Sequence, residues 1–258
     1  MTELTVKSIL RSRTESPPPA PAFGHFGSGE TAGGGWPSGR GDPAAPVTRR
    51  PDMPAEDGRF RGLMGAPAWD RLPAVVRHRF SRHVGPGDRR LFHGDVVSTT
   101  LSGAGRLLAR LARLVGGPLP DQDGATGPAT VLVTECPALG GQIWTRTYCR
   151  PGRLPQTISS VKRFSGPTGL EEYLGHGLVM RLDLLVEAGC LVFRSAGYDI
   201  EIRGRRLPVP VWLAPGICTV THRDLGNGRF AFTLELEHPW LGRLAHQVAH
   251  FEEVSGHD

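Results

Sequence analysis

Alternating apolar and polar residues begin near Val131 and recur almost to the C-terminus, and this pattern limits the possible folds more than any other part of the sequence. A period of two places successive side chains on opposite faces of a β-strand, so it predicts an antiparallel sheet with one buried face. Short links such as Gly226-Asn227-Gly228 favour tight hairpins, because Asn and Gly tolerate positive φ. The strands predicted here span residues 129–136, 142–149, 156–164, 177–187, 190–203, 216–223 and 229–237.

The segment before this sheet predicts two helices and one more strand. Apolar residues from Trp69 to Phe80 recur at helical spacing and indicate the first helix. A strand is expected at about 91–101, followed by an amphipathic helix at about 105–115. On that second helix the leucines would face the core and the arginines would form another face, with Leu107, Leu108, Leu111 and Leu114 on one side and Arg106, Arg110 and Arg113 on the other.

Three shorter segments complete the predicted order of elements. Residues 168–173 look like one helical turn, and residues 207–210 must be extended and outside a central ladder position, because their two prolines lack a backbone N–H. Residues 245–251 fit either a helix or a last strand. We therefore predict an α+β fold with a strongly twisted, mostly antiparallel sheet of about seven or eight strands, half-barrel or barrel-like, packed with two N-terminal helices.

The chain divides into a leader and one domain. Residues 1–57 are rich in Pro and Gly, and their apolar residues follow no period of 2 or 3.6. Such a segment buries too little apolar surface to offset the entropy of ordering it, so we predict a disordered leader. Residues 58–258 are long enough for a single α+β domain with a sizeable core.

Composition argues against several classes of protein. A net charge of +5 is modest beside the basic clusters of nucleic-acid-binding proteins, so no nucleic-acid partner is expected. No apolar run has the length of a signal peptide or a membrane span, which predicts a cytoplasmic protein with no integral membrane segment. The four cysteines fit neither a zinc site nor a dense disulfide framework, and no phosphate loop is present, so no metal or cofactor is predicted.

The strand near residue 144 carries the most informative polar residue. Alternation places Trp144, Arg146 and Tyr148 on one face. If this face points inward, the guanidinium needs a carboxylate or a ligand anion to compensate its charge. Glu135, Glu171 or Glu172 could supply that carboxylate. The alternative is that Arg146 lies over an aromatic ring at the surface, without a functional role.

The histidines offer two further hypotheses. His176 lies between two glycines in a predicted loop, and together with Glu172 it could form an acid/base pair. A turn histidine without a catalytic role is the alternative. His246 and His250 could share a metal ion if their segment is a helix, but on a strand they would stand about 13 Å apart.

Several short motifs follow one another in a familiar order. They are Phe60-Arg61-Gly62-Leu63-Met64-Gly65 leading to Trp69 and Leu72-Pro73, then Trp144-Thr145-Arg146-Thr147-Tyr148, Glu172-Tyr173-Leu174-Gly175, Leu207-Pro208-Val209-Pro210, Gly228-Arg229-Phe230-Ala231-Phe232 and Leu241-Gly242-Arg243-Leu244. This order resembles the bacterial family catalogued as domain of unknown function 4166, over about residues 60–254. Members of that family look like stand-alone proteins or like C-terminal partners of oxidoreductase domains with a dinucleotide-binding fold.

The resemblance relates the chain to a family, but it does not imply a reaction. Where the fused proteins have their enzyme, this chain has its leader, and it lacks a Gly-x-Gly-x-x-Gly motif after a strand. The resemblance therefore supplies no dehydrogenase function and no catalytic residues.

Three hypotheses about function follow from these residues. The leading one is a non-catalytic domain whose curved sheet encloses an apolar pocket for a small hydrophobic or amphipathic ligand, with Trp144, Arg146 and Tyr148 near its polar end. The second is an enzyme, such as an isomerase, cyclase or hydrolase, that uses the same cavity with Glu172, His176 or Arg146 in acid/base or oxyanion roles. The third is a module that docks an oxidoreductase partner or an anionic surface through the arginines of the 105–115 helix.

Overall fold

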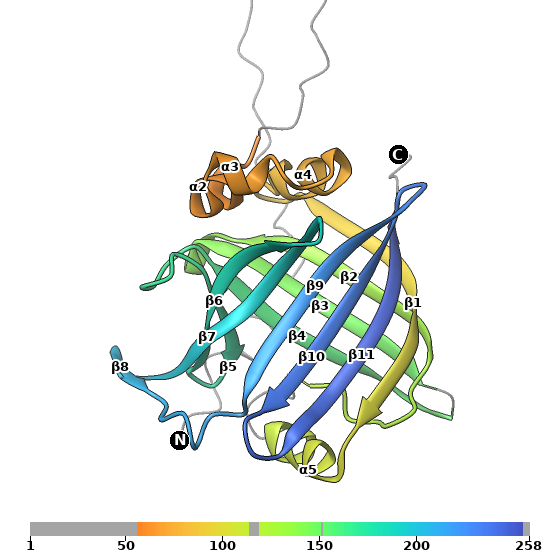
Figure 1. The fold of residues 1–258 in the computed structure, drawn as a ribbon, viewed down its shortest axis with the longest axis vertical. Helices are drawn as coiled ribbons and strands as arrows, with labels where there is room; N and C mark the ends of the chain where they lie inside the picture. Colours follow the sequence, from red (N-terminus) through yellow and green to blue (C-terminus); the bar gives the residue numbers. More distant parts are fainter. Residues whose placement is uncertain (1–55, 114–118, 151, 255–258) are drawn as a thin grey trace, which may run out of the picture. The chain divides into compact units, whose positions relative to one another are not determined.

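The computed structural model describes residues 56–113, 119–150 and 152–254, so the predicted disorder of the leader lies almost entirely outside the described residues. Within these ranges ten strands close into an antiparallel barrel, and an eleventh, β8, extends the sheet beside β7 (Figure 1). The ring runs β6-β5-β4-β3-β2-β1-β11-β10-β9-β7, and pairing of β6 with β7 closes it. The strands are β1 (Arg89–Leu101), β2 (Gly127–Cys136), β3 (Gly141–Arg150), β4 (Arg153–Arg163), β5 (Glu171–Gly175), β6 (Leu178–Glu187), β7 (Cys190–Ile202), β8 (Arg205–Pro208), β9 (Ile217–Gly226), β10 (Arg229–His238) and β11 (Gly242–Glu253).

The structure confirms an α+β fold with a mostly antiparallel sheet, but the sheet has more strands than predicted and is a complete barrel. Alternation within a strand does not show which distant strands will pair, and closure depends on such pairings, including that of β1 with β11. The register of that pair shifts between Val96 and Ser98, an irregularity of the kind that bends a strand. Gly94 allows the same two strands to approach, because a Cβ there would lie 1.9 Å from the carbonyl oxygen of His250.

Residues 168–173 do not form the predicted helical turn. Glu171 and Glu172 instead belong to β5, which pairs with β4 and β6. Their cross-strand partners on β4 are Arg163 and Lys162 respectively, so each glutamate faces an opposite charge. These two ion pairs form across the sheet, between β4 and β5, and they outweigh the local preference of residues 168–173 for a helical turn. Residues 245–251 belong to β11, and residues 205–208 form the short edge strand β8.

Three short helices lie across one end of the barrel, which we call the cap end (Figure 1). They are α2 (Arg59–Met64), α3 (Ala66–Trp69) and α4 (Ala74–Ser81). The predicted single helix is broken because Pro73, with ψ near 144°, is extended immediately before α4. Its apolar stripe is nevertheless buried, and Phe60 on α2 packs edge-to-face against Phe80 at a ring-centre distance of 5.3 Å. A 3₁₀ turn, η2 (Pro137–Leu139), links β2 to β3.

The fourth α-helix, α5 (Gly103–Ala112), lies at the opposite end, which we call the mouth end (Figure 1). Ser102 caps it, with its Oγ accepting a hydrogen bond from the Gly105 amide at 3.1 Å. The predicted leucine face is only partly correct, because the helix packs through the small residues Gly105, Ala109 and Ala112, and Leu107 and Leu111 are exposed. The fourth leucine of that face, Leu114, lies outside the described residues. In the described part of the chain no helix is long and apolar enough to cross a membrane.

Candidate ligand-binding cavity

A cavity of about 530 Å³ occupies the half of the barrel nearer to α5. Its lining is mainly aliphatic and aromatic, and it comes from strands around most of the ring, from α5 and from the loop between β8 and β9. Leu111, Trp212 and Leu241 line the cavity and are also exposed, so it opens at the mouth end. Small-molecule sites usually have volumes of ~300–1,000 Å³, and this cavity lies in that range.

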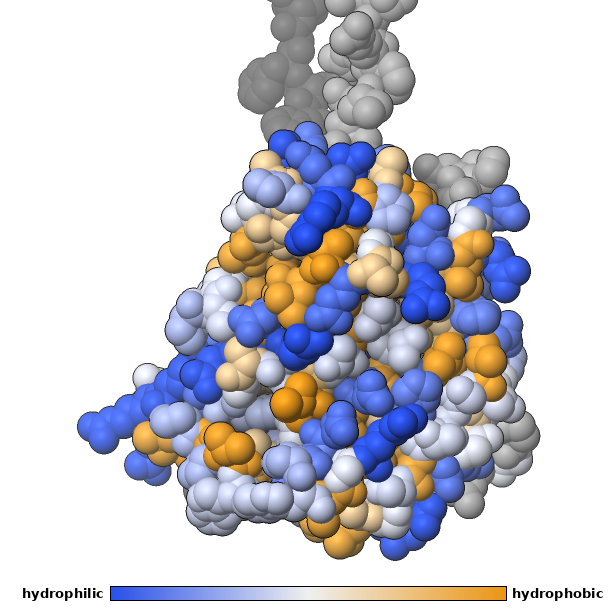
Figure 2. All heavy atoms as spheres, in the orientation of Figure 1, coloured by the Kyte–Doolittle hydropathy of each residue, from blue (hydrophilic) through white to orange (hydrophobic). Residues whose placement is uncertain are grey.

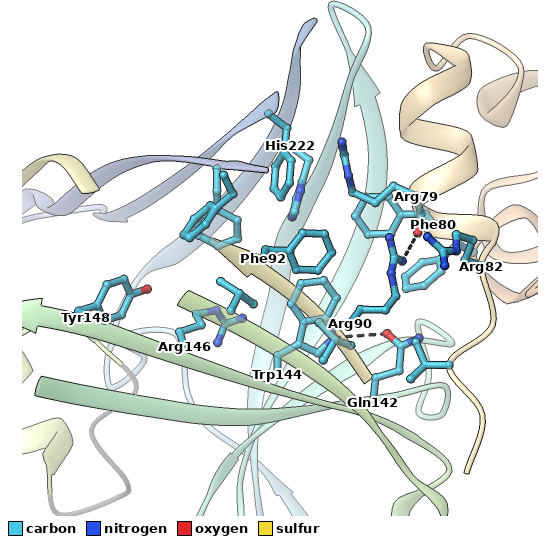
Figure 3. Close-up of a pocket in the computed structure, with 17 residues that line it drawn as sticks. Arg79, Phe80, Arg82, Arg90, Phe92, Gln142, Trp144, Arg146, Tyr148 and His222 are labelled. Atoms are coloured by element: carbon cyan, nitrogen blue, oxygen red, sulfur yellow. Dashed lines mark hydrogen bonds between the residues drawn. The ribbon is translucent and has the colours of Figure 1, made fainter. Parts of the chain in front are cut away.

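One face of β3 carries basic and aromatic side chains into the barrel. Trp144 and Tyr148 are buried, and Arg146 lies between them on the same interior face (Figure 3). The Arg146 guanidinium carbon is 6.0 Å from the centre of the Trp144 ring and 5.9 Å from that of Phe232. Because only 12% of the Arg146 side chain is exposed, the alternative that it lies over an aromatic ring at the surface is wrong.

The carboxylate of Glu172 on β5 compensates the buried guanidinium. Its Oε1 accepts hydrogen bonds from Ser160 Oγ at 2.5 Å and from Arg146 Nη2 at 3.4 Å. Its Oε2 accepts a hydrogen bond from Lys162 Nζ at 2.6 Å. Arg146 also donates to Ser160 Oγ at 3.1 Å. We call Arg146, Ser160, Lys162 and Glu172 the polar cluster.

The polar cluster carries an excess of positive charge. Burial alone would raise the pKa of Glu172, but Lys162, Arg146 and the hydrogen bonds from Lys162 and Ser160 lower it to about 2. Burial lowers the pKa of Lys162, and the adjacent carboxylate opposes that effect. With both basic groups protonated, two cations share one carboxylate in an apolar interior.

A smaller cavity of about 30 Å³ lies beneath α4 at the cap end (Figure 3). Arg146 and Tyr148 line both cavities and therefore lie between them. Phe230 stacks on His222 at a ring-centre distance of 5.7 Å, and the Arg79 guanidinium carbon is 4.0 Å from the centre of the same Phe230 ring. His222 Nδ1 and Arg79 Nη1 are buried without a hydrogen-bond partner among the described residues.

His222 is a neutral imidazole in this environment. Burial lowers its pKa well below the ordinary value, and the positive charges of Arg79, Lys162 and Arg146 lower it further. The sequence prediction missed His222 and Lys162. Alternation along β9 and β4 could have placed them inside, since His222 follows the cavity-lining Cys218 and Val220 at intervals of two residues.

Of the three glutamates considered as partners of Arg146, the structure selects Glu172. Glu171, the adjacent residue of β5, faces the other way and is fully buried between Arg163 and Arg206, at 2.8 and 2.7 Å. Among the described contacts Glu135 does not pair with Arg146. Two consecutive residues of one strand necessarily point to opposite faces, so only one of the pair Glu171–Glu172 could enter the barrel.

The structure does not bring His176 to Glu172. His176 is exposed, with φ of 49°, in the turn between β5 and β6, and it is not among the described residues that line the cavity. Its neighbours Leu174 and Leu178 do line the cavity. His246 and His250 both lie on β11, where four residues of strand separate them too widely to share a metal ion.

The cysteines differ in environment. Cys190 and Cys218 are buried, Cys149 is exposed, and all four thiols are free in the structure. Cys218 lines the large cavity. Burial, and to a lesser extent the negative charge of Glu172, raises the pKa of its thiol to about 12. Its thiol is therefore protonated at neutral pH and is a poor nucleophile.

The chain belongs to the family described as Domain of unknown function (DUF4166), which matches residues 72–251 and confirms the resemblance seen in the motif order. No curated protein and no solved structure matches the chain. Family membership thus identifies relatives, and the geometry of the barrel provides the argument about function.

Proposed function

We propose that the protein binds a small amphipathic molecule, with its apolar body in the 530 Å³ cavity and an anionic group, such as a carboxylate, against Arg146. The observation that carries this proposal is the combination of an apolar cavity open at one end with a buried, positively charged polar cluster beside it. An apolar cavity favours a hydrocarbon or ring system, because burying such a ligand removes its surface from water.

Arg146 has the capacity to bind the anionic group. A guanidinium has five N–H donors, and the described side-chain hydrogen bonds of Arg146 reach only Ser160 and Glu172, the latter at 3.4 Å. A ligand carboxylate would balance the second cation of the polar cluster and could accept the remaining donors. Arg146 also lines the large cavity, so the ligand would not have to leave the apolar space to reach it.

The charges of the cluster make Glu172 unsuited to act as a general base at neutral pH. A carboxylate whose pKa is held at about 2 is a weak base at neutral pH, and the Cys218 thiol is protonated. An isomerase, cyclase or hydrolase reaction in this cavity would need a group poised near neutral pH. His176, the residue considered for that role, lies in an exposed turn.

The first experiment is native mass spectrometry of the full chain, with solvent extraction and identification of any bound molecule. The second is a titration with cis-parinaric acid, a fluorescent fatty acid, in competition with oleate and with the uncharged oleyl alcohol. Oleate is expected to compete at least about tenfold better, as one charge-assisted hydrogen bond implies. In Arg146→Met this preference should disappear, whereas Arg194→Met, which changes a partly exposed side chain, should retain it. Equal competition by acid and alcohol in the unaltered protein would contradict the anionic head group, and no binding of either would contradict the proposed function.

A further inference from the structure

Large apolar side chains gather on the surface around the cavity mouth. They come from α5, from the loop between β8 and β9 and from the turn between β10 and β11. Their residues are between 54% and 78% exposed. We call this set the apolar rim: Leu107, Leu111, Val211, Trp212, Leu213, Trp240 and Leu241.

The apolar rim is continuous with the cavity. Leu111, Trp212, Leu213 and Leu241 also line the cavity, so exposed and enclosed apolar surfaces meet at the opening. In the space-filling view, hydrophobic residues interrupt the polar surface along the lower edge, where Figure 1 places α5 (Figure 2). Exposed apolar patches of this kind mark sites of interaction with a protein, a membrane or a ligand.

The charged residues within the three segments that carry the rim are all basic. The residues of the three segments, 103–113, 207–216 and 239–242, include Arg106, Arg110 and Arg113 but no Asp or Glu. Arg106 and Arg113 form ion pairs with Asp123 and Asp121, whereas Arg110 forms none among the described residues. The surface around the mouth thus combines exposed Trp and Leu with Arg, which is the composition of segments that lie in the interface of an anionic bilayer.

We propose that the apolar rim docks on the surface of a bilayer that contains anionic lipids, with the cavity mouth facing the membrane. The leucines and tryptophans would enter the region between headgroups and acyl chains, and the arginines of α5 would contact lipid phosphates. Because the rim surrounds the cavity mouth, a protein bound to the rim would cover the mouth. A bilayer bound there would instead give an apolar ligand a continuous path into the cavity. The docking itself does not require a ligand, but its purpose, exchange of ligand with the membrane, rests on the proposed function.

The test uses three rim residues that do not line the cavity. Leu107, Val211 and Trp240 are exposed, and the cavity lining does not include them. The triple variant Leu107→Ser, Val211→Ser, Trp240→Ser should therefore weaken membrane binding, and it leaves every cavity-lining residue unchanged. Leu225→Ser is the control, since Leu225 is exposed at the end of β9 on the cap end of the barrel. The full chain is mixed with phosphatidylcholine vesicles, with or without phosphatidylglycerol, and bound protein is measured by flotation.

The unaltered chain is expected to float with phosphatidylglycerol vesicles and much less with phosphatidylcholine alone, and added salt should reduce binding. The triple variant should lose about tenfold or more of the affinity, because three apolar side chains leave the interface. Arg110→Glu should weaken binding only to the anionic vesicles. Failure of the unaltered chain to float, an equal loss in Leu225→Ser, or a concentration-dependent dimer abolished by the triple variant would overturn the proposal.

A second readout separates this proposal from the ligand-binding function. The triple variant should bind cis-parinaric acid in solution with unchanged affinity, while it takes the fatty acid more slowly from anionic vesicles. If the unaltered chain binds the fatty acid but does not bind vesicles, the docking proposal is contradicted and the ligand-binding function is not. Vesicle binding by a protein that takes up neither fatty acid nor alcohol would contradict the ligand-binding function and leave docking supported.

Discussion

Lys162 Nζ lies 2.6 Å from Glu172 Oε2, and both side chains are more than nine-tenths buried inside the barrel. The two residues are direct cross-strand partners on β4 and β5. An ion pair in an apolar interior contributes little net stability, because desolvation offsets the attraction between the charges. The pair matters for the cavity in another way. Because Glu172 is closer to Lys162 than to Arg146, Arg146 is left as the less fully compensated cation beside the cavity.

Removing one partner of this pair should be more harmful than removing both. Lys162→Met leaves Glu172 buried with only Arg146 as a cationic partner, and it should lower the free energy of unfolding by about 3–5 kcal/mol. The double variant Lys162→Met, Glu172→Leu should recover part of that loss, although it leaves Arg146 without its carboxylate. Urea denaturation measures both changes. Equal stability of Lys162→Met and the unaltered chain would show that the pair is not buried as described.

The pKa of Glu172 predicts a loss of stability in strong acid. Its folded value of about 2 lies below the ordinary value of 4.5, so the unfolded chain takes up this proton first as the pH falls. The stabilising contribution is present above pH ~4.5 and is lost as the pH falls toward about 2, with a size of about 3 kcal/mol. Glu172→Gln should remove this part of the pH dependence. A variant whose stability falls as steeply as that of the unaltered chain over this range would contradict the prediction.

His222 predicts a separate effect at milder acidity. Because burial holds its pKa well below the ordinary 6.5, the unfolded chain binds a proton that the folded chain does not. Above pH ~6.5 the titration of His222 does not reduce the free energy of unfolding. Below that pH it lowers the free energy of unfolding by about 1.4 kcal/mol per pH unit. His222→Phe keeps an aromatic ring and should flatten the slope between pH 6 and 5, whereas the exposed His176→Gln should not. Thermal unfolding at several pH values distinguishes the two variants.

The cavity should be sensitive to its free volume. Met180 on β6 lines the cavity and is buried, so Met180→Trp would occupy space that a ligand needs. We expect this variant to lose at least about tenfold of its affinity for cis-parinaric acid, the equivalent of about 1.4 kcal/mol. Val97→Trp is the matched control, because Val97 is half exposed and does not line the cavity. Unchanged affinity in Met180→Trp would place the fatty acid outside this cavity.

Local sequence patterns predict the strands of this protein far better than their pairing. Alternation locates β1 to β4, β6, β7, β9 and β10 to within a few residues, since each strand carries its own in-and-out pattern. It misses β5, a strand of five residues in which Glu171 and Glu172 pair with opposite charges on β4, and it leaves β11 ambiguous. Closure into a ring of ten strands depends on long-range pairing that no local period encodes.

The same limit applies to the site. The sequence predicts that Trp144, Arg146 and Tyr148 share a face, and that a buried Arg146 needs a carboxylate, with Glu172 among the candidates. It does not predict Lys162 as a second cation in the polar cluster, because that depends on the register of β4 against β5. The ligand-binding role of these residues remains a prediction.

The position of α5 also depends on one close contact that the sequence pattern alone does not reveal. A Cβ on Gly105 would lie 1.8 Å from the carbonyl oxygen of Leu244 on β11, whereas a Cβ on Gly103 would have no heavy atom nearer than 4.0 Å. The helix therefore approaches the barrel through Gly105, and this contact leaves Leu107 on the surface as part of the apolar rim.

Exchanging these two glycines for alanine should consequently give opposite results. Gly105→Ala forces α5 away from β11 and should cost about 2 kcal/mol or more of the free energy of unfolding, as overpacking against backbone does. Gly103→Ala should be neutral or stabilise the protein by up to about 1 kcal/mol, because alanine favours the helix more than glycine does. Since displacement of α5 also disturbs the rim, Gly105→Ala should bind anionic vesicles more weakly than Gly103→Ala at equal folded fraction. Equal stability of the two variants in urea would show that α5 is not anchored through Gly105.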